Sequence, residues 1–346
     1  MDSVTQIALG GAVGYAVLGK QVGRKAMLWG AILGTLPDLD VLIPYGDAIA
    51  NFTYHRGFSH SLFVHLLASP FIVWLILSIH RGTVEHRNRW FYLVFLCLTT
   101  HAIIDSFTVY GTQLLWPLTE YPFAVSNLFI IDPMVTLPLL FGLVAALLLR
   151  AKPASARTCN VVGLTLSCMY MTWSLGAKVY IDNKVKTALA QNNISVTAYM
   201  STPAPFNTLL WRVVAMSDGE YYEAYASVFD TPSEVSLNGY KTSPELLSGL
   251  EDAWGVQRLK WFTKGLYSVK SDGPEIIMSD LRMGIECAYA FNFVVAKKTI
   301  LGPQLVDVEQ LTQRPDLSEV NSIFERIWDP SINLAPNQKR LKGCLQ

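Results

Sequence analysis

Charged residues are scarce in this sequence. Lys, Arg, Asp and Glu make up 16% of its 346 residues, against about 25% in a typical soluble domain. The 27 basic residues balance the 27 acidic ones, so no basic surface predicts binding to nucleic acid. With 51% hydrophobic residues and a mean hydropathy of +0.30, the chain is unlike a disordered, collagenous or ordinary soluble protein.

Paired cysteines are also missing. The five cysteines are scattered and no CxxC motif occurs, which argues against a thiolate zinc site and a thioredoxin-like redox motif. Cys287 and Cys344 could form a disulfide if their part of the chain lies outside the cytoplasm. The spacing alone leaves this pairing open.

Histidine is absent after residue 101, and charged residues are fewer before residue 180 than after it. Residues 1–180 contain 11 Lys and Arg and 8 Asp and Glu, whereas residues 181–346 contain 16 and 19. This shift predicts a membrane-embedded helical domain over 1–180, a linker over 181–207 and a soluble α+β domain over 208–346. The expected fold is therefore an α-helical polytopic membrane bundle of about six spans, followed by a smaller α+β domain.

Six apolar stretches predict the membrane helices, because a span needs about 20 mostly apolar residues. They cover 4–19, 26–43, 61–79, 90–108, 128–149 and 158–177. Three basic residues fall in each of the connections 20–25, 81–89 and 150–157. Positive charge favours the cytoplasmic side, so both termini and the C-terminal domain are expected outside the cytoplasm.

The C-terminal domain shows the turn chemistry of antiparallel sheets. Asp218-Gly219 separates two apolar runs, 208–217 and 220–229, and an Asp-Gly pair is a strong hairpin signal. Further strands and helices are expected; the strands are 266–270, 275–281 and 288–296, and the helices are 244–254 and 317–328. Asp280 and Arg282 beside the second hairpin predict a structural ion pair at a strand end; alternatively, this domain could cap a metal site in the first domain and select substrate.

Ionisable residues inside the membrane part gather on one side under this topology. Charge in a bilayer is costly, so each such residue is a candidate for function. The six that three separate segments bring to the same side are Asp38, Asp40, His55, His60, His101 and Asp105. Asp2 and Asp132 are weaker candidates, since Asp2 can simply face water and Asp132 can be a hydrogen-bonded buried residue.

The spacings of these residues favour a shared metal site. His101 and Asp105 lie four apart, on one face of a helix. Asp38 and Asp40 flank one residue of a Pro-Asp-Leu-Asp stretch, and in an extended conformation such residues point the same way. The stretch from His55 to His60 suits a loop that runs into a helix.

Histidine and aspartate without cysteine suit Zn²⁺, Mn²⁺ or Fe²⁺. We expect a divalent metal, with zinc preferred and manganese or iron possible, and five or six ligands would suffice for two ions. Arg56, beside His55, is a candidate catalytic residue that would hold an anionic oxygen. The plainer reading is that these side chains bond to one another inside the bundle.

Several segments resemble the YdjM-like family of inner-membrane, metal-dependent hydrolases, over about residues 1–135. They are MDSVTQIALGGAVG, GTLPDLD, YHRGFSHS, HAIIDSFTVYGTQLLWP and FIIDP. The segments DGEYYEAYASVFD, RLKWFTKGLYSV and MSDLRMG look like a longer, mainly proteobacterial branch. The resemblance implies a multi-pass protein of the bacterial inner membrane, with presumed ligands at the same six positions. Gln6 stands where many members carry His, which implies a smaller part for the N-terminal segment in metal binding.

Two hypotheses from different classes follow. A membrane-bound metal-dependent hydrolase would use activated water against an ester or phosphoester of a lipid-linked or other membrane-associated substrate. The alternative is a non-enzymatic protein with a structural or sensing metal site and an outer domain that binds a partner. A transporter fits less well, because the ionisable residues do not cross the membrane. The substrate, the number of ions and the oligomeric state stay open.

Overall fold

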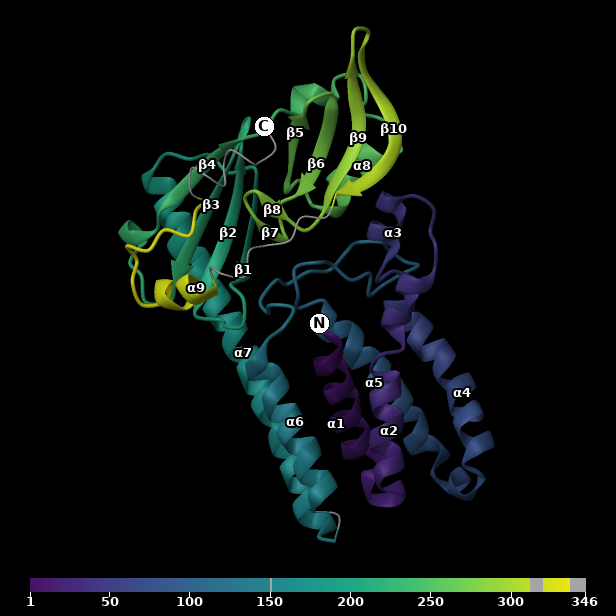
Figure 1. Ribbon diagram of the computed structural model, residues 1–346. Coiled ribbons are helices and arrows are strands. Elements are labelled where there is room, and N and C mark those ends of the chain that lie inside the picture. The colour runs from purple at the N-terminus through teal and green to yellow at the C-terminus, as the bar shows by residue number, and fades with distance from the viewer. Residues whose placement is uncertain (150, 312–319, 337–346) are drawn as a thin grey trace. The chain divides into compact units, whose positions relative to one another are not determined.

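The computed structural model describes residues 1–149, 151–311 and 320–336, and the chain forms two compact units (Figure 1). The helical unit comprises Met1–Ile43, His55–Leu175 and Pro205–Asn207. The sheet unit comprises Pro44–Tyr54, Gly176–Ala204 and the described residues from Thr208 onward. A helical N-terminal region followed by a β-sheet domain confirms the coarse α+β layout.

The helical unit consists of consecutive helices joined by short turns. Its α-helices are α1 (Ser3–Val22), α2 (Arg24–Leu33), α4 (Leu62–Ile79), α5 (Arg87–Asp105), α6 (Pro133–Leu148) and the first part of α7 (Pro153–Gln191). Its 3₁₀ turns are η1 (Pro37–Leu42), η2 (Phe58–His60) and η3 (Arg81–His86). Trp90 and Leu93 of α5 are fully buried with Ile76 of α4, so these two helices share a core.

Glycines let α1 and α2 pack backbone to backbone. A Cβ atom placed on Gly30 would lie 2.1 Å from the carbonyl oxygen of Gly10, and one on Gly14 would lie 2.4 Å from that of Ala26. No side chain larger than hydrogen fits at such contacts. The close approach also brings the end of α2 to the face of α5 that carries the candidate site, where Gly34 meets His101.

Among the described residues, one helix is clearly long and apolar enough to cross a membrane. α4, Leu62–Ile79, has a mean hydropathy of 2.3 and is long and apolar enough to span a bilayer, while α6 is apolar but has 16 residues. The stretch 26–43, predicted as one span, is not one helix, because α2 ends at Leu33 and Pro37 opens a 3₁₀ turn. The structure therefore does not show six spans.

The sheet unit holds two four-stranded antiparallel sheets. The first has the order β1-β2-β3-β4, with β1 (Ala198–Pro203), β2 (Leu210–Ser217), β3 (Glu220–Ser227) and β4 (Leu237–Lys241). The second has the order β10-β9-β6-β5, with β5 (Tyr267–Asp272), β6 (Glu275–Asp280), β9 (Asn292–Thr299) and β10 (Gly302–Leu311). A small ribbon pairs β7 (Gly284–Ile285) with β8 (Ala288–Tyr289).

Short helices complete the sheet unit. They are α3 (Ala48–Tyr54), α8 (Trp254–Phe262), α9 (Val320–Arg326) and the 3₁₀ turns η4 (Pro232–Glu234) and η5 (Pro244–Leu247). The C-terminal part of α7 belongs to the same unit, and its Ile181 and Val185 are buried against Trp211 of β2. Residues 181–207, expected as a linker, thus contain the end of α7 and strand β1.

Both predicted hairpins are confirmed. Ser217 pairs with Glu220 across Asp218-Gly219, and Asp272 pairs with Glu275 in the second hairpin. The helix predicted over 244–254 is wrong, since only η5 forms there and α8 begins at Trp254. The helix predicted over 317–328 appears as α9, and residues 317–319 lie outside the described part.

Two pairings in the C-terminal domain were considered from the sequence: an ion pair of Asp280 with Arg282 and a disulfide of Cys287 with Cys344. Arg282 and Asp280 form a buried ion pair, with Nη2 and Oδ2 2.7 Å apart. Cys287 is disulfide-bonded, whereas Cys344 lies outside the described residues.

Candidate metal site

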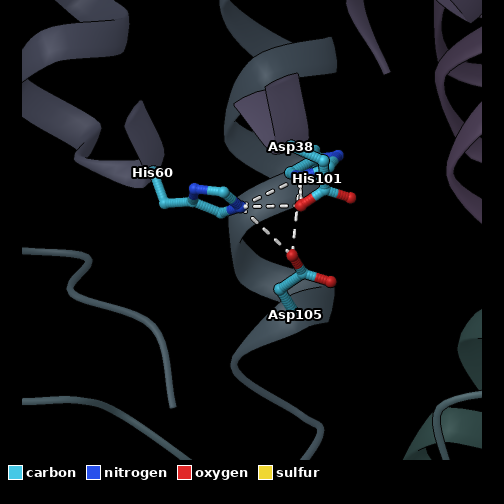
Figure 2. A group of neighbouring side chains, drawn as sticks. All are labelled: Asp38, His60, His101 and Asp105. Atoms are coloured by element: carbon cyan, nitrogen blue, oxygen red, sulfur yellow. Dashed lines mark hydrogen bonds and ion pairs between the residues drawn. The ribbon is translucent and has the colours of Figure 1, made fainter. Parts of the chain in front are cut away.

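Four side chains of the helical unit converge on one point (Figure 2). Asp38 comes from η1, His60 from η2, and His101 and Asp105 from α5. His60 Nε2 lies 3.1 Å from His101 Nε2, 3.2 Å from Asp105 Oδ2 and 3.3 Å from Asp38 Oδ1. His101 Nε2 lies 3.4 Å from Asp105 Oδ2 and 3.5 Å from Asp38 Oδ1.

The end of α2 fixes the ring of His101. Gly34 follows the last residue of α2, and its carbonyl oxygen is one of those that a helix end leaves without an intrahelical partner. His101 Nδ1 lies 2.7 Å from this oxygen. A carbonyl can only accept, so Nδ1 carries a proton, and in the neutral imidazole Nε2 then presents its lone pair to the other three side chains.

A relay through Ser59 fixes the ring of His60 in the same way. The Ser59 hydroxyl donates to Asp40 Oδ2 at 2.6 Å, since a carboxylate can only accept. Having used its proton, Ser59 Oγ accepts from His60 Nδ1 at 2.9 Å. In the neutral ring, His60 Nε2 then also presents a lone pair, directed at the same point as that of His101.

The cluster is therefore rich in lone pairs and poor in protons. Two imidazole lone pairs and two carboxylate oxygens face one another, and among the described groups none donates a hydrogen bond to Asp38 Oδ1. With both imidazoles neutral, such a set favours a positive charge at its centre. Metal bonds of about 2.0 Å in a tetrahedron give ligand separations of about 3.3 Å, which the five separations match. These four residues can hold a divalent ion.

Exposure differs among the four ligands. The side chains of His60, His101 and Asp105 are fully buried, whereas that of Asp38 is 28% exposed. Pro37 stands at the first position of η1, where its fixed φ and missing N–H are tolerated. The extended conformation predicted for 37–40 is wrong. These residues belong to the 3₁₀ turn η1, which places Asp38 in the four-atom cluster and Asp40 outside it.

Asp40 and His55 pair with each other beside the four-atom cluster. Asp40 Oδ1 lies 2.7 Å from His55 Nδ1, and its Oδ2 accepts from the backbone N–H of Arg56 at 2.9 Å. Asp40 thus acts on the cluster through Ser59 and His60.

Arg56 is held against a ligand. Its Nε lies 3.3 Å from Asp105 Oδ2, and its guanidinium lies 5.2 Å from the centre of the Tyr110 ring. The residue adopts a left-handed conformation with φ of 62°, which costs a side-chain-bearing residue energy. Its N–H to Asp40 and its carbonyl, which accepts from Gln113 N–H at 3.0 Å, hold the turn in place.

Asp105 has further partners that the ligand pattern did not include. Gln6 Nε2 donates to Asp105 Oδ1 at 2.8 Å, and the amino group of Met1 contacts the same oxygen. Oδ2 is left to face the cluster. The sequence signals for these supports are weak: Gln6 departs from the family pattern, and nothing in the sequence marks Ser59 as a partner of His60.

Asp2 and Asp132 lie outside the four-atom cluster and cap helices. Asp2 accepts from the N–H groups of Val4 at 3.0 Å and Thr5 at 3.1 Å at the start of α1. Asp132 accepts from Met134 N–H at 3.0 Å at the start of α6, and from the Tyr170 hydroxyl at 3.1 Å. Both satisfy helix N-terminal amides, a common task for aspartate.

A helical unit with a long apolar helix and a buried His and Asp cluster fits a membrane protein with metal-binding capacity. The chain belongs to the YdjM inner membrane protein family, whose model matches residues 1–184. This confirms the family resemblance and identifies an inner membrane protein. Hydrolysis is not part of what the family match shows.

Two relatives match parts of the chain. The inner membrane protein YbcI of Escherichia coli (strain K12) is 33% identical over 123 residues, which are 35% of this chain and 69% of YbcI. The uncharacterized protein YfhP of Bacillus subtilis (strain 168) is 29% identical over 142 residues, 39% of this chain and 43% of YfhP. The match thus spans less than half the length of YfhP. No solved structure matches the chain.

Proposed function

We propose that this protein is a metal-dependent hydrolase of the bacterial inner membrane, with Asp38, His60, His101 and Asp105 as ligands of one zinc ion. The observation that carries the proposal is the set of four potential ligand atoms that converge on one point, five of whose separations match those of a tetrahedral site. When bound, a divalent ion would supply a Lewis acid and lower the pKa of water. Manganese and iron accept the same ligands.

The unequal exposure of the ligands supports a reactive role. Catalytic zinc sites commonly use three protein ligands and keep a fourth position for water or substrate. His60, His101 and Asp105 are the three buried ligands, and Asp38 is the accessible one. Asp38 is placed to give way to substrate or to take up a proton.

Arg56 brings positive charge beside the ligand Asp105. We assign it the stabilisation of negative charge that develops as an ester or phosphoester is attacked. Asp40 and His55, outside the four-atom cluster, orient His60 through Ser59. A site within a membrane protein favours a lipid-linked or otherwise amphipathic substrate.

The proposed topology has six spans, with the C-terminal domain outside the cytoplasm. Basic residues in alternate connections support it. The disulfide at Cys287 adds an independent argument, because disulfides persist in oxidising compartments and are rare in the cytosol.

Turnover by the protein reconstituted in lipid nanodiscs tests the hydrolase proposal. The probes are p-nitrophenyl carboxylic and phosphodiesters, offered to metal-stripped protein and to protein reloaded with Zn²⁺, Mn²⁺ or Fe²⁺. We expect hydrolysis only after reloading, and a loss of about 100-fold or more in Asp38→Asn. Asp132→Asn keeps its capping oxygen and should retain wild-type turnover. Metal-loaded protein without turnover on any probe would contradict the proposal.

One observation favours the second candidate, a structural or sensing metal site. Four protein ligands fill a tetrahedron, as in closed structural zinc sites. Arg56→Gln separates the two candidates, since Arg56 is not a ligand. An enzyme would lose turnover and keep its metal, whereas a structural site would show only a change in stability.

A further inference from the structure

The connection between η1 and η2 leaves the helical unit and returns to it. Asp38 and Asp40 precede the crossing at Ile43, and the chain re-enters at His55. The residues between them, Pro44–Tyr54, belong to the sheet unit. The two ligands that come from turns, Asp38 and His60, are therefore joined by a segment folded into the other unit.

Helix α3 is the anchored part of this segment. A helix of seven residues is not stable alone in water, so its conformation depends on packing. Phe52 is 4% exposed, and its ring centre lies 4.9, 4.4 and 5.3 Å from those of Phe262, Phe291 and Phe293. An aromatic side chain buried among three others is a strong attachment.

Helix α8 supplies the rest of the attachment, and the two helices lie against each other (Figure 1). Ile49 is fully buried, and a Cβ atom on Gly255 of α8 would lie 2.9 Å from its Cδ1. Arg258 Nε donates to Thr53 Oγ1 at 3.0 Å, and the guanidinium lies 4.5 Å from the centre of the Tyr54 ring. A shape match, a hydrogen bond and a cation–π contact thus hold α3 on α8.

The connectors between α3 and the metal site are short. Tyr54 is adjacent to His55, whose Nδ1 pairs with Asp40 at 2.7 Å. Asp40 in turn orients His60 through Ser59. On the other side, three residues separate Asp40 from Pro44. A change in the distance between the two ends of this segment, Pro44 and Tyr54, must therefore disturb the pair that orients the candidate ligand His60.

We infer that the sheet unit acts as a clamp on residues 44–54 and thereby sets the affinity of the metal site. The inference rests on the proposed metal site, but not on hydrolysis. While the sheet unit holds α3, the turns that carry Asp38 and His60 are held at the separation the ion needs. Release of α3 lets these turns move apart. Coupling between two sites is reciprocal, so metal binding must also tighten the attachment of α3.

The first test measures metal affinity by competition with a chromogenic chelator on the full-length protein. Phe52→Ala weakens the attachment, and a Gly-Ser-Gly insertion between Ile43 and Pro44 lengthens a connector while leaving every packed residue in place. We expect the zinc Kd to rise about tenfold or more in both. Phe229→Ala is the matched control, because its ring stacks on Trp328 at 4.7 Å, away from α3, and its Kd should stay at the wild-type value.

The second test uses the reciprocal effect. Hydrogen exchange is followed in residues 48–54 of wild-type protein with and without zinc, and we expect slower exchange when zinc is bound. The clamp would be overturned if both Phe52→Ala and the insertion variant bound zinc with wild-type affinity. It would also be overturned if hydrogen exchange in residues 48–54 were the same with and without zinc. A wild type that binds no zinc at all would instead overturn the metal site itself. Absence of turnover alone would leave the clamp intact.

Discussion

His60 and His101 each use one ring nitrogen to direct the other. A backbone carbonyl fixes His101, while a side-chain relay from Asp40 through Ser59 fixes His60. Partners of this kind set the tautomer and orientation of a metal ligand, and their loss commonly costs 10- to 100-fold in metal affinity. The proposed metal site would therefore depend on residues that do not touch the ion.

Ser59→Ala tests this dependence. The alanine leaves His60 in place but removes the acceptor for its Nδ1 proton, so the ring loses its fixed tautomer. We expect the zinc Kd to rise about 10- to 100-fold without loss of fold, measured by chelator competition. Ser78→Ala is the control, because its hydroxyl donates to Leu75 O within α4. A Kd for Ser59→Ala equal to that of the control would show that the relay plays no part.

The sequence was informative about the ligands but not about their supports. His101 and Asp105 could be placed on one helical face from a spacing of four, and this face carries both ligands. Asp40 and His55 were predicted as metal ligands, and the structure pairs them with each other beside the four-atom cluster. The cause is the conformation of residues 37–42, a 3₁₀ turn opened by Pro37, which a period-two extended reading of the same residues misplaces.

Helices α1 and α2 show how small residues place an element. Gly10 and Gly30 meet at backbone distance, and the end of α2 supplies the carbonyl that orients His101. The glycine content of 4–19 was visible in the sequence. The sequence did not show that these glycines would contact α2, because packing of backbone against backbone produces no periodic pattern of hydrophobic residues.

Gly30→Ala should disrupt this packing. The new Cβ atom would lie 2.1 Å from Gly10 O, so the helices must separate. We expect a loss of about 1–3 kcal/mol in the free energy of unfolding, as for other overpacked cores, together with weaker zinc binding. Gly176→Ala in α7 is the matched control. Its Cβ atom meets nothing within 4 Å, so it should be neutral or stabilising by about 0.5–1 kcal/mol. Thermal melts that do not distinguish the two variants would contradict the packing argument.

Strand pairs were easier to predict than helix ends. The Asp218-Gly219 turn has one favoured conformation between two apolar runs, and the hairpin formed there. Residues 244–254 contain apolar residues at helical intervals, but Pro244 and Gly249 allow only the short turn η5. In both segments, the residues that favour turns determined which local structure formed.

At the scale of the whole molecule, composition predicted two parts but placed their boundaries imperfectly. The change in charge near residue 180 lies close to the change of unit at Gly176. The membership of Pro44–Tyr54 in the sheet unit was not visible. Its buried residues Ile49 and Phe52 carry no local sign of which surface they meet, because that surface is built by residues more than 200 positions later.

Elemental mass spectrometry would show whether Asp38, His60, His101 and Asp105 hold a divalent metal ion. Purified wild type is compared with His101→Gln and Asp105→Asn, and with Asp132→Asn as a control that removes a carboxylate charge outside the cluster. We predict about one ion per chain in wild type and control, and almost none in the two ligand variants. Equal, substoichiometric metal in all four proteins would contradict the claim and leave a cluster of side chains bonded only to one another.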